Sequence, residues 1–256
     1  MQKNQRQTEQ ITFDNGGVRP FKAFVSGVRL AVNVDNTRHF FSLMDAIDGP
    51  QHERNFQRYL KTPTGARINS EKFEIKSILE NRDRLRSFPD GSLGRRYLEF
   101  LELEGLDVSM LYEAELEAAS SALKLDPPRR LYNETGTAIH DLLHVLTGYG
   151  RDPLGEACLL AFTAEQFALR GVAFAANSIA LREQLRQPKT PVFRALKEAR
   201  SRARQMVWIA EIDWRDWLAL PIDTVRSELG LSQRRELFYS NDAIETSNCI
   251  ADKSAA

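Results

Sequence analysis

The sequence has no excess charge of either sign, because 35 lysine and arginine residues balance 35 aspartate and glutamate residues. Proteins that grip nucleic acid through its phosphates carry a clear basic excess, so this balance argues against a general nucleic-acid binder. Long apolar runs are also missing. The longest, from Ala157 to Ala164, stops at Glu165 and falls far short of the roughly 18 residues that cross a membrane.

Cysteine is scarce, and the two cysteines, Cys158 and Cys249, do not suggest a disulfide framework. A chain without such a framework fits a reducing compartment. The first ten residues contain no apolar stretch, no serine and one arginine. They therefore resemble neither a secretory signal nor a transit peptide. We expect a cytoplasmic protein.

Histidine is rare as well, yet two of the four histidines lie one helical turn apart at His140 and His144. On an α-helix, residues four apart differ by about 40° and neighbours by about 100°. Asp141 therefore shares one side of the helix with both histidines. Imidazoles and carboxylates together suit zinc, iron or manganese, so this spacing predicts a divalent metal site.

A second helix is predicted to bring a fourth ligand, Glu156, to the same place. Gly148 is a typical helix stop, and Asp152 followed by Pro153 is a typical helix start. An antiparallel hairpin with this turn would place Glu156 level with His144. The alternative is that the histidines merely occupy the polar face of an ordinary amphipathic helix.

A narrow polar stripe precedes the histidines on the remaining face of this apolar helix. Asn133, Gly136 and Thr137 belong to it. Glycine weakens a helix interior, so Gly136 suggests room for a ligand. Asn133 and Thr137 are candidates for hydrogen bonds to the metal ligands, which would orient them.

The rest of the chain is helical in period, with no sustained β-alternation and no internal repeat, so the predicted fold class is all-α. We expect a flexible arm over residues 1–17, one helical domain over 18–239 and a loose tail over 240–256. Within the domain, helices are expected to end at Gly49–Pro50, to run from 71 to 87, and to cover 154–170, 171–185 and the segment after Pro191.

Three further features have two interpretations each. Gly91–Ser92 could cradle a phosphate or be a turn that starts a helix. Small residues between Ala157 and Ala180 could line a channel for an apolar chain or allow close helix packing. The basic helix that begins near Phe193 and precedes Trp208, Trp214 and Trp217 could lie on an anionic membrane or cover the core.

Three segments of the chain resemble the fourth coenzyme Q (ubiquinone) biosynthesis protein family. HDLLHVLTGYGRDPLGE is similar to the family signature of HDxxH, eleven residues and Glu, with Gly before the Glu. FPDGSLGRRYLEFLELEGL and DWRDWLALPIDTVRSELGL are similar to flanking segments in the same order. Thr137 stands where many relatives have a basic residue. The sequence lacks the transit peptide of mitochondrial members and in this respect resembles bacterial members of the family.

The resemblance implies an all-α fold and a zinc or similar ion held by His140, Asp141, His144 and Glu156, with these residues acting in catalysis. It also implies removal of the ring C1 carboxyl of a polyprenyl-hydroxybenzoate, oxidatively in some accounts. Implied partners are prenyl lipids, other ubiquinone biosynthesis enzymes and the periphery of the bacterial inner membrane. A homodimer is left open.

Two other functional classes compete with a decarboxylase. In the first, the protein is a lipid-binding scaffold for the quinone pathway, and its metal is structural. In the second, it is an HD-type phosphohydrolase, which would need another histidine upstream, where the chain offers only His39 and His52. A zincin protease would need glutamate where Asp141 stands.

Overall fold

The computed structural model describes residues 37–106, 125–231 and 239, and from 37 to 46 only the backbone. Within these ranges it contains helices and no strand, which confirms the all-α class. In chain order the elements are α2 (Thr37–Tyr59), α3 (Pro63–Glu71), α4 (Lys76–Leu79), α5 (Arg82–Arg86), α6 (Leu93–Glu104), α8 (Pro127–Ala138), α9 (His140–Thr147), α10 (Pro153–Phe167), α11 (Arg170–Arg186), α12 (Val192–Gln205), the 3₁₀ turns η2 (Ile209–Glu211) and η3 (Trp214–Asp216), and α13 (Ile222–Glu228).

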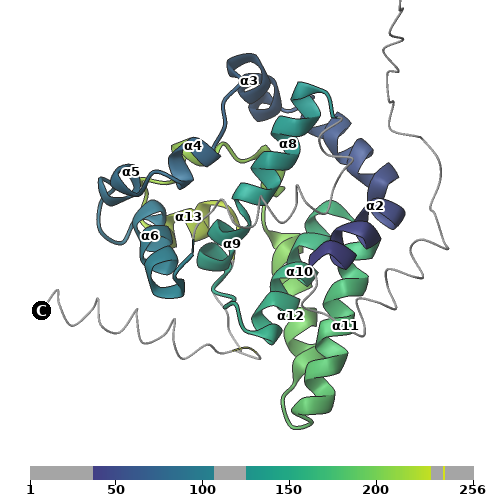
Figure 1. Ribbon diagram of the computed structural model, residues 1–256. Helices are drawn as coiled ribbons and strands as arrows, with labels where there is room; N and C mark the ends of the chain where they lie inside the picture. Colours follow the sequence, from purple (N-terminus) through teal and green to yellow (C-terminus); the bar gives the residue numbers. More distant parts are fainter. Residues whose placement is uncertain (1–36, 107–124, 232–238, 240–256) are drawn as a thin grey trace, which may run out of the picture.

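Helix α10 is the central element of one half of the molecule, with α11 and α12 packed along it and α2 across the corner (Figure 1). The small residues of this region, including Ala161, Ala176 and Ala180, are fully buried. Burial of alanines lets helix backbones approach closely, so the packing interpretation of the alanine-rich stretch is favoured over a channel.

The other half is formed by α6, α9 and α13, with α8 leading into α9 (Figure 1). One hydrophobic cluster runs through both halves and contains residues from Ile75 to Tyr239. Trp208 and Trp214 are also buried, so neither serves as a surface anchor. None of the described helices combines the length and apolar character that crossing a bilayer requires.

Helix α2 does not end at Gly49–Pro50, as the sequence suggested, but continues to Tyr59. Proline removes one helical hydrogen bond and normally ends or kinks a helix. Tertiary contacts on both sides of Pro50 oppose this. The buried carboxylate of Asp48 accepts from Gly171 N at 2.9 Å, and Asn55 Nδ2 donates to the Phe167 carbonyl at 2.8 Å. The side chains of α2 therefore cap both helices at the α10–α11 corner.

The prediction of one helix from 71 to 87 is also wrong, since α3, α4 and α5 divide this region. Lys72 has a left-handed φ of 51° and ends α3. Asn81 starts α5 by accepting a hydrogen bond from Arg84 N at 2.9 Å. Asparagine competes well for backbone hydrogen bonds, and the apolar period alone did not reveal it.

The Gly91–Ser92 turn feeds a helix. The hydroxyl of Ser92 accepts from Arg95 N at 3.2 Å and so caps α6. The next two backbone N–H groups, of Leu93 and Gly94, donate to the Leu220 and Leu218 carbonyls at 2.9 and 2.8 Å. Because these donors are used within the fold, the phosphate-cradle interpretation loses its support.

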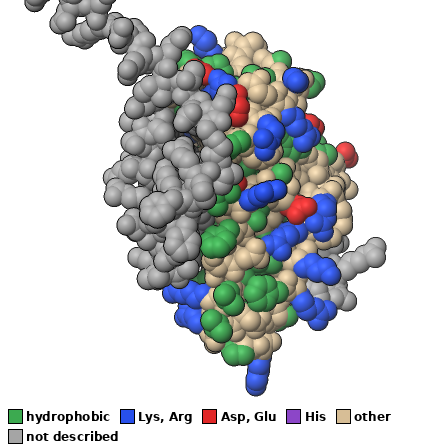
Figure 2. Space-filling model, turned by 90° about the vertical axis from the view of Figure 1, so that its right-hand side faces the viewer, with side chains coloured by type: hydrophobic (Ala, Val, Ile, Leu, Met, Phe, Trp, Pro, Cys, Tyr) green, Lys and Arg blue, Asp and Glu red, His purple; other side chains and the backbone are tan. Residues whose placement is uncertain are grey.

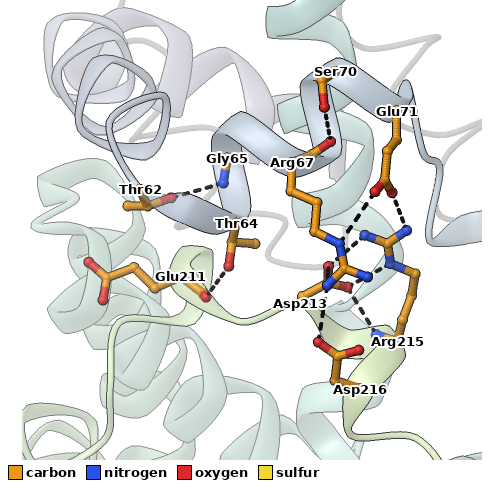
Figure 3. Close-up of polar contacts among 10 residues, drawn as sticks. All are labelled: Thr62, Thr64, Gly65, Arg67, Ser70, Glu71, Glu211, Asp213, Arg215 and Asp216. Carbon is orange, nitrogen blue, oxygen red and sulfur yellow. Dashed lines mark hydrogen bonds and ion pairs between the residues drawn. The ribbon is translucent and has the colours of Figure 1, made fainter.

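An ion-pair cluster fastens α3 to the segment around η3 (Figure 3). The guanidinium of Arg215 donates to both oxygens of the buried Asp213 carboxylate, at 2.8 and 2.6 Å. It also pairs with Glu71, while Arg67 lies 3.2 Å from Asp213. Burial alone would raise the pKa of Asp213, but the two arginines outweigh it and lower that pKa.

This cluster should make the protein acid-sensitive. A carboxyl whose pKa is lowered by folding stabilises the native state above its ordinary value of 3.8, and this contribution is lost as the pH falls through the folded-state pKa. We expect Asp213→Asn to reduce the free energy of unfolding at neutral pH and to weaken its fall on acidification. Urea unfolding at several pH values would measure this. Asp83→Asn, at a carboxylate that is 96% exposed, is the matched control.

Candidate metal centre

The candidate site lies on the hairpin of α9 and α10, and the predicted turn is confirmed. Gly148 ends α9 with a left-handed φ of 74°, and its N–H bonds the His144 carbonyl. Asp152 caps α10 by accepting from Leu154 N and Gly155 N, both at 3.1 Å, with Pro153 at the first helical position. The turn therefore sets the register of Glu156 against α9.

The preceding helix is not continuous, since Ile139 separates α8 from α9. The N–H of Ile139 still donates to the Thr135 carbonyl at 3.1 Å, so the interruption is slight. The apolar side of this region behaves as its pattern predicted: Leu142, Leu143 and Leu146 are buried in the main hydrophobic cluster.

Three of the four predicted ligands form one group, and the fourth, Glu156, lies beside the two histidines of that group. Donor atoms of His140, Asp141 and His144 fall within 4.8 Å of one another. The two Nε2 atoms are 3.3 Å apart. From α10, the Glu156 carboxylate lies 3.5 Å from Nε2 of His144 and 3.7 Å from Nε2 of His140. This group of donors could hold a metal ion.

These separations suit ligands that share one ion. Two nitrogen ligands about 2.0–2.1 Å from a tetrahedral zinc lie about 3.3–3.4 Å from each other, close to the observed Nε2–Nε2 distance. The distances from Glu156 to the imidazoles, 3.5 and 3.7 Å, exceed the usual N–H···O length. The Nε2–Nε2 contact at 3.3 Å also has the length of a hydrogen bond between the two rings, so the spacing is compatible with a shared ion and does not require one.

His144 is held in one orientation. It is fully buried, its Nδ1 lies 2.8 Å from the Tyr149 carbonyl, and its ring stacks on Phe100 of α6 with centroids 5.8 Å apart. A carbonyl can only accept, so Nδ1 carries a proton, and in the neutral form of the ring Nε2 is the nitrogen with a lone pair. A backbone carbonyl that orients a histidine in this way is typical of metal sites.

The imidazole of His140 and the carboxylate of Glu156 face a partly open side of the site. The side chains of His140 and Glu156 are 27% and 29% exposed. Burial would lower the pKa of His140, but Glu156, aided by Asp141, outweighs it and raises that pKa. Burial would likewise raise the pKa of Glu156, but His140 and His144 outweigh it and hold that pKa well below its usual range. The carboxylate is thus ionised and ready to bind a cation.

The three residues predicted to support the ligands lie on α8. A methyl group at Gly136 would meet nothing within 4 Å, so this glycine is not required for packing. Asn133 lines a shallow hollow between α2 and α8 together with His52 and Arg129. The proposed hydrogen bonds of Asn133 and Thr137 to the metal ligands stay predictions.

An HD-type phosphohydrolase would need another histidine upstream. Among the side chains that the structure describes, no upstream histidine belongs to the group of His140, Asp141 and His144. His52 lies in the hollow beside Asn133. The side chain of His39 lies outside the described residues. The structure thus gives this alternative no support.

Two arginines that sequence analysis missed hold the end of α9. Arg226 of α13 donates to the carbonyls of Leu146 and Val145 at 2.9 and 3.2 Å, and the buried Arg202 of α12 donates to that of Thr147 at 3.0 Å. Carbonyls at a helix C-terminus lack internal partners and carry partial negative charge, so guanidinium groups stabilise them. Nothing in the local sequence marks these long-range contacts.

Tyr239 is the last residue of the predicted domain. In the structure its side chain holds the hairpin turn in place. Its buried hydroxyl accepts from Gly150 N at 2.8 Å and donates to the Asp152 carboxylate. Since Asp152 also caps α10, the tyrosine connects the turn to the helix that carries Glu156. We regard it as a positioning residue.

Tyr239→Phe should lower the free energy of unfolding by about 1–3 kcal/mol, because the buried N–H of Gly150 loses its acceptor. It should also weaken metal binding, which isothermal titration would measure. A fall in stability with unchanged metal affinity would show that the turn does not set the position of Glu156. Tyr132→Phe, at a tyrosine on α8 outside the turn, is a matched control.

Comparison with known proteins gives a consistent result. The family model described as "Coenzyme Q (ubiquinone) biosynthesis protein Coq4" matches residues 18–114 and 130–235. A mouse protein named as a mitochondrial ubiquinone biosynthesis protein COQ4 homolog is 26% identical over 67% of this chain and 62% of its own length. The Yarrowia lipolytica protein of that name is 26% identical over 71% of this chain and 66% of its own.

The chain thus spans slightly less than two thirds of the length of these relatives. A crystal structure from the bacterium Nostoc punctiforme, described as that of a candidate ubiquinone biosynthesis protein, superposes with a TM-score of 0.60. The match covers 84% of this chain and 99% of that one, at 18% identity. At this identity the likeness concerns the fold alone, which is all-helical here.

Proposed function

Because the chain belongs to the coenzyme Q (ubiquinone) biosynthesis protein Coq4 family, we propose that it acts in ubiquinone biosynthesis, as a metal-dependent decarboxylase. The substrate class is a polyprenyl-hydroxybenzoate, and the bond that breaks joins ring C1 to its carboxyl. The observation that supports the proposal is the group formed by His140, Asp141 and His144, with the Glu156 carboxylate beside both histidines and a partly open side. A closed ligand set favours a structural metal, and an open one favours catalysis.

A divalent ion bound there, with zinc, iron or manganese as the candidates, would supply Lewis-acid stabilisation of negative charge on the substrate. His144 would contribute its oriented Nε2, and Glu156 an ionised carboxylate. His140 and Glu156 line the open side, where a substrate ring would arrive. The open surface over Gly136, about one turn before His140, offers room beside it.

The proton balance assigns a task to the site residues. When CO2 leaves, the electron pair of the C1 bond stays on the ring, and C1 then takes a proton. A carboxyl or imidazole group at the site that does not bind the ion would be the donor. In an oxidative version two electrons would pass to dioxygen, which would leave as hydrogen peroxide, and C1 would gain its hydroxyl from water. An iron or manganese site, or a ring that reacts with dioxygen itself, would then be needed.

A second candidate is a prenyl-lipid-binding scaffold with a structural metal. One observation favours it: the ligands come from two helices of a single hairpin, so an ion would lock α9 against α10. In either case we propose that the protein works beside other ubiquinone enzymes at the cytoplasmic periphery of a bacterial inner membrane. A homodimer is a further proposal that the single chain leaves open.

The test is to load the purified chain with zinc, iron or manganese in turn and supply a prenylated hydroxybenzoate labelled at the carboxyl carbon. Release of labelled CO2 by the wild type, and its loss in Glu156→Gln, supports the decarboxylase. If no metal gives turnover while Glu156→Gln still restores quinone synthesis to a deletion strain, the decarboxylase proposal is wrong. In that case, retained capture of pathway enzymes would support the scaffold.

A further inference from the structure

The hairpin of α11 and α12 concentrates positive charge. Residues 170–205 contain nine arginine and lysine residues but two glutamates, in a chain whose net charge is zero. One of the two acidic groups, Glu183, is buried and paired with Arg186. The remaining chain must therefore be acidic overall, and the hairpin is a basic pole of the molecule.

The same hairpin exposes large apolar side chains. Phe174, Leu181 and Leu185 of α11 are 46%, 54% and 74% exposed. At 100° per residue they fall within about 40° of one another, so they form one stripe along the outer side of the helix. Phe193, at the start of α12, is 47% exposed. Figure 2 shows apolar side chains gathered on this face among lysines and arginines.

The stripe is not needed for the core. The inner side of α11 is already packed by Ala175, Ala176 and Ala180, each at most 1% exposed. Leaving several large apolar groups in water on one line of a helix is unfavourable, and such patches mark contact surfaces. The contact must also accommodate a basic surround that includes Arg170, Lys189 and Lys197.

We propose that this hairpin is the surface by which the protein lies on an anionic lipid bilayer. Apolar side chains flanked by basic ones are the pattern of a helix that lies in the membrane interface. Anionic headgroups attract nearby lysines and arginines by about 1 kcal/mol each. A second copy that met this hairpin through the same face would present the same positive charge and be repelled. The inference does not depend on the chemistry of the metal centre.

Co-sedimentation of the purified full chain with vesicles tests this. The wild type should bind vesicles of phosphatidylglycerol and phosphatidylcholine in equal parts and should not bind pure phosphatidylcholine, and added salt should weaken binding. Lys189→Glu with Lys197→Glu should lower the partition coefficient by about tenfold or more. Leu181→Ser with Leu185→Ser should lower it by about tenfold.

Matched controls lie elsewhere on the molecule. Lys61→Glu with Lys72→Glu changes net charge equally at exposed lysines beside α3, and Leu103→Ser alters a leucine on α6 that is 61% exposed. Both should bind as the wild type does. The proposal is overturned if the control variants lose vesicle binding equally, or if the wild type does not bind anionic vesicles. In the second case, capture of an acidic protein would identify the alternative occupant. All these variants should retain metal binding, so failure here is distinguishable from failure of the metal centre.

Discussion

Replacing His144 by alanine is expected to weaken metal binding by more than about 100-fold, since even residues that only orient a ligand contribute 10–100-fold. His144 is the most constrained ligand of the site: it is fully buried, and its Nδ1 proton is committed to the Tyr149 carbonyl 2.8 Å away. Its Nε2 lone pair is therefore available without rearrangement. Metal content of the purified protein and competition with a chelator would measure the change.

The His144 variant also leaves a cavity and removes the contact with the Tyr149 carbonyl, so loss of metal in it could result from unfolding. His140→Ala separates the two effects, because His140 is 27% exposed and its removal disturbs the core less. We expect it to lose metal while keeping most of its helical circular dichroism. His52→Ala, at a histidine outside the cluster, should bind metal as the wild type does. Unchanged metal affinity in His140→Ala and His144→Ala together would remove the metal centre from consideration.

Replacing Gly155 by alanine is expected to be the most damaging small change in the hairpin. A methyl group at this position would lie 2.1 Å from the Gly150 carbonyl oxygen and 2.7 Å from the Tyr239 hydroxyl. The obstacle is backbone, so the turn itself must shift. Overpacking of this kind costs about 1–3 kcal/mol, and for a chain of this size each kcal/mol lowers Tm by about 2–4 °C. Thermal unfolding followed by circular dichroism would measure the loss.

The next residue is Glu156, so the shift should also weaken metal binding in Gly155→Ala. Gly136→Ala is the matched control, because a methyl group there meets nothing within 4 Å. Alanine in an open helix interior should raise stability by about 0.5–1 kcal/mol. If both variants change stability equally, the close approach at Gly155 does not limit the hairpin. The glycine of the family signature thus has a physical reason that spacing alone did not supply.

Local patterns were reliable where the physics is local. The glycine that ends α9, the Asp152–Pro153 start of α10 and the apolar side of α9 were all predicted, because caps and helical periodicity depend on neighbouring residues. The prediction that His140, Asp141, His144 and Glu156 meet rested on two helices and one short turn. In the described geometry the first three form one group and Glu156 lies beside the two histidines, while the four-ligand site, the bound metal and the reaction stay proposals.

Errors arose where distant contacts outweigh local preference. Pro50 should have ended a helix, yet Asp48 and Asn55 fasten α2 to the α10–α11 corner on both sides of it. The segment from 71 to 87 has a helical period, yet a left-handed Lys72 and the cap at Asn81 divide it. The expected arm over 1–17 and tail over 240–256 lie outside the described residues, and the domain limits stay predictions.

The sequence by itself therefore determined the helical class, the hairpin and its four candidate ligands, because each depends on spacing within a few turns of helix. The tertiary structure decided which groups hold that hairpin in place: Arg202, Arg226 and Tyr239 reach it from 55 to 89 residues away along the chain. It also decided that the small residues of α10 and α11 serve packing and that Trp208 and Trp214 belong to the core. Such contacts depend on which surfaces meet after folding, and no local pattern records them.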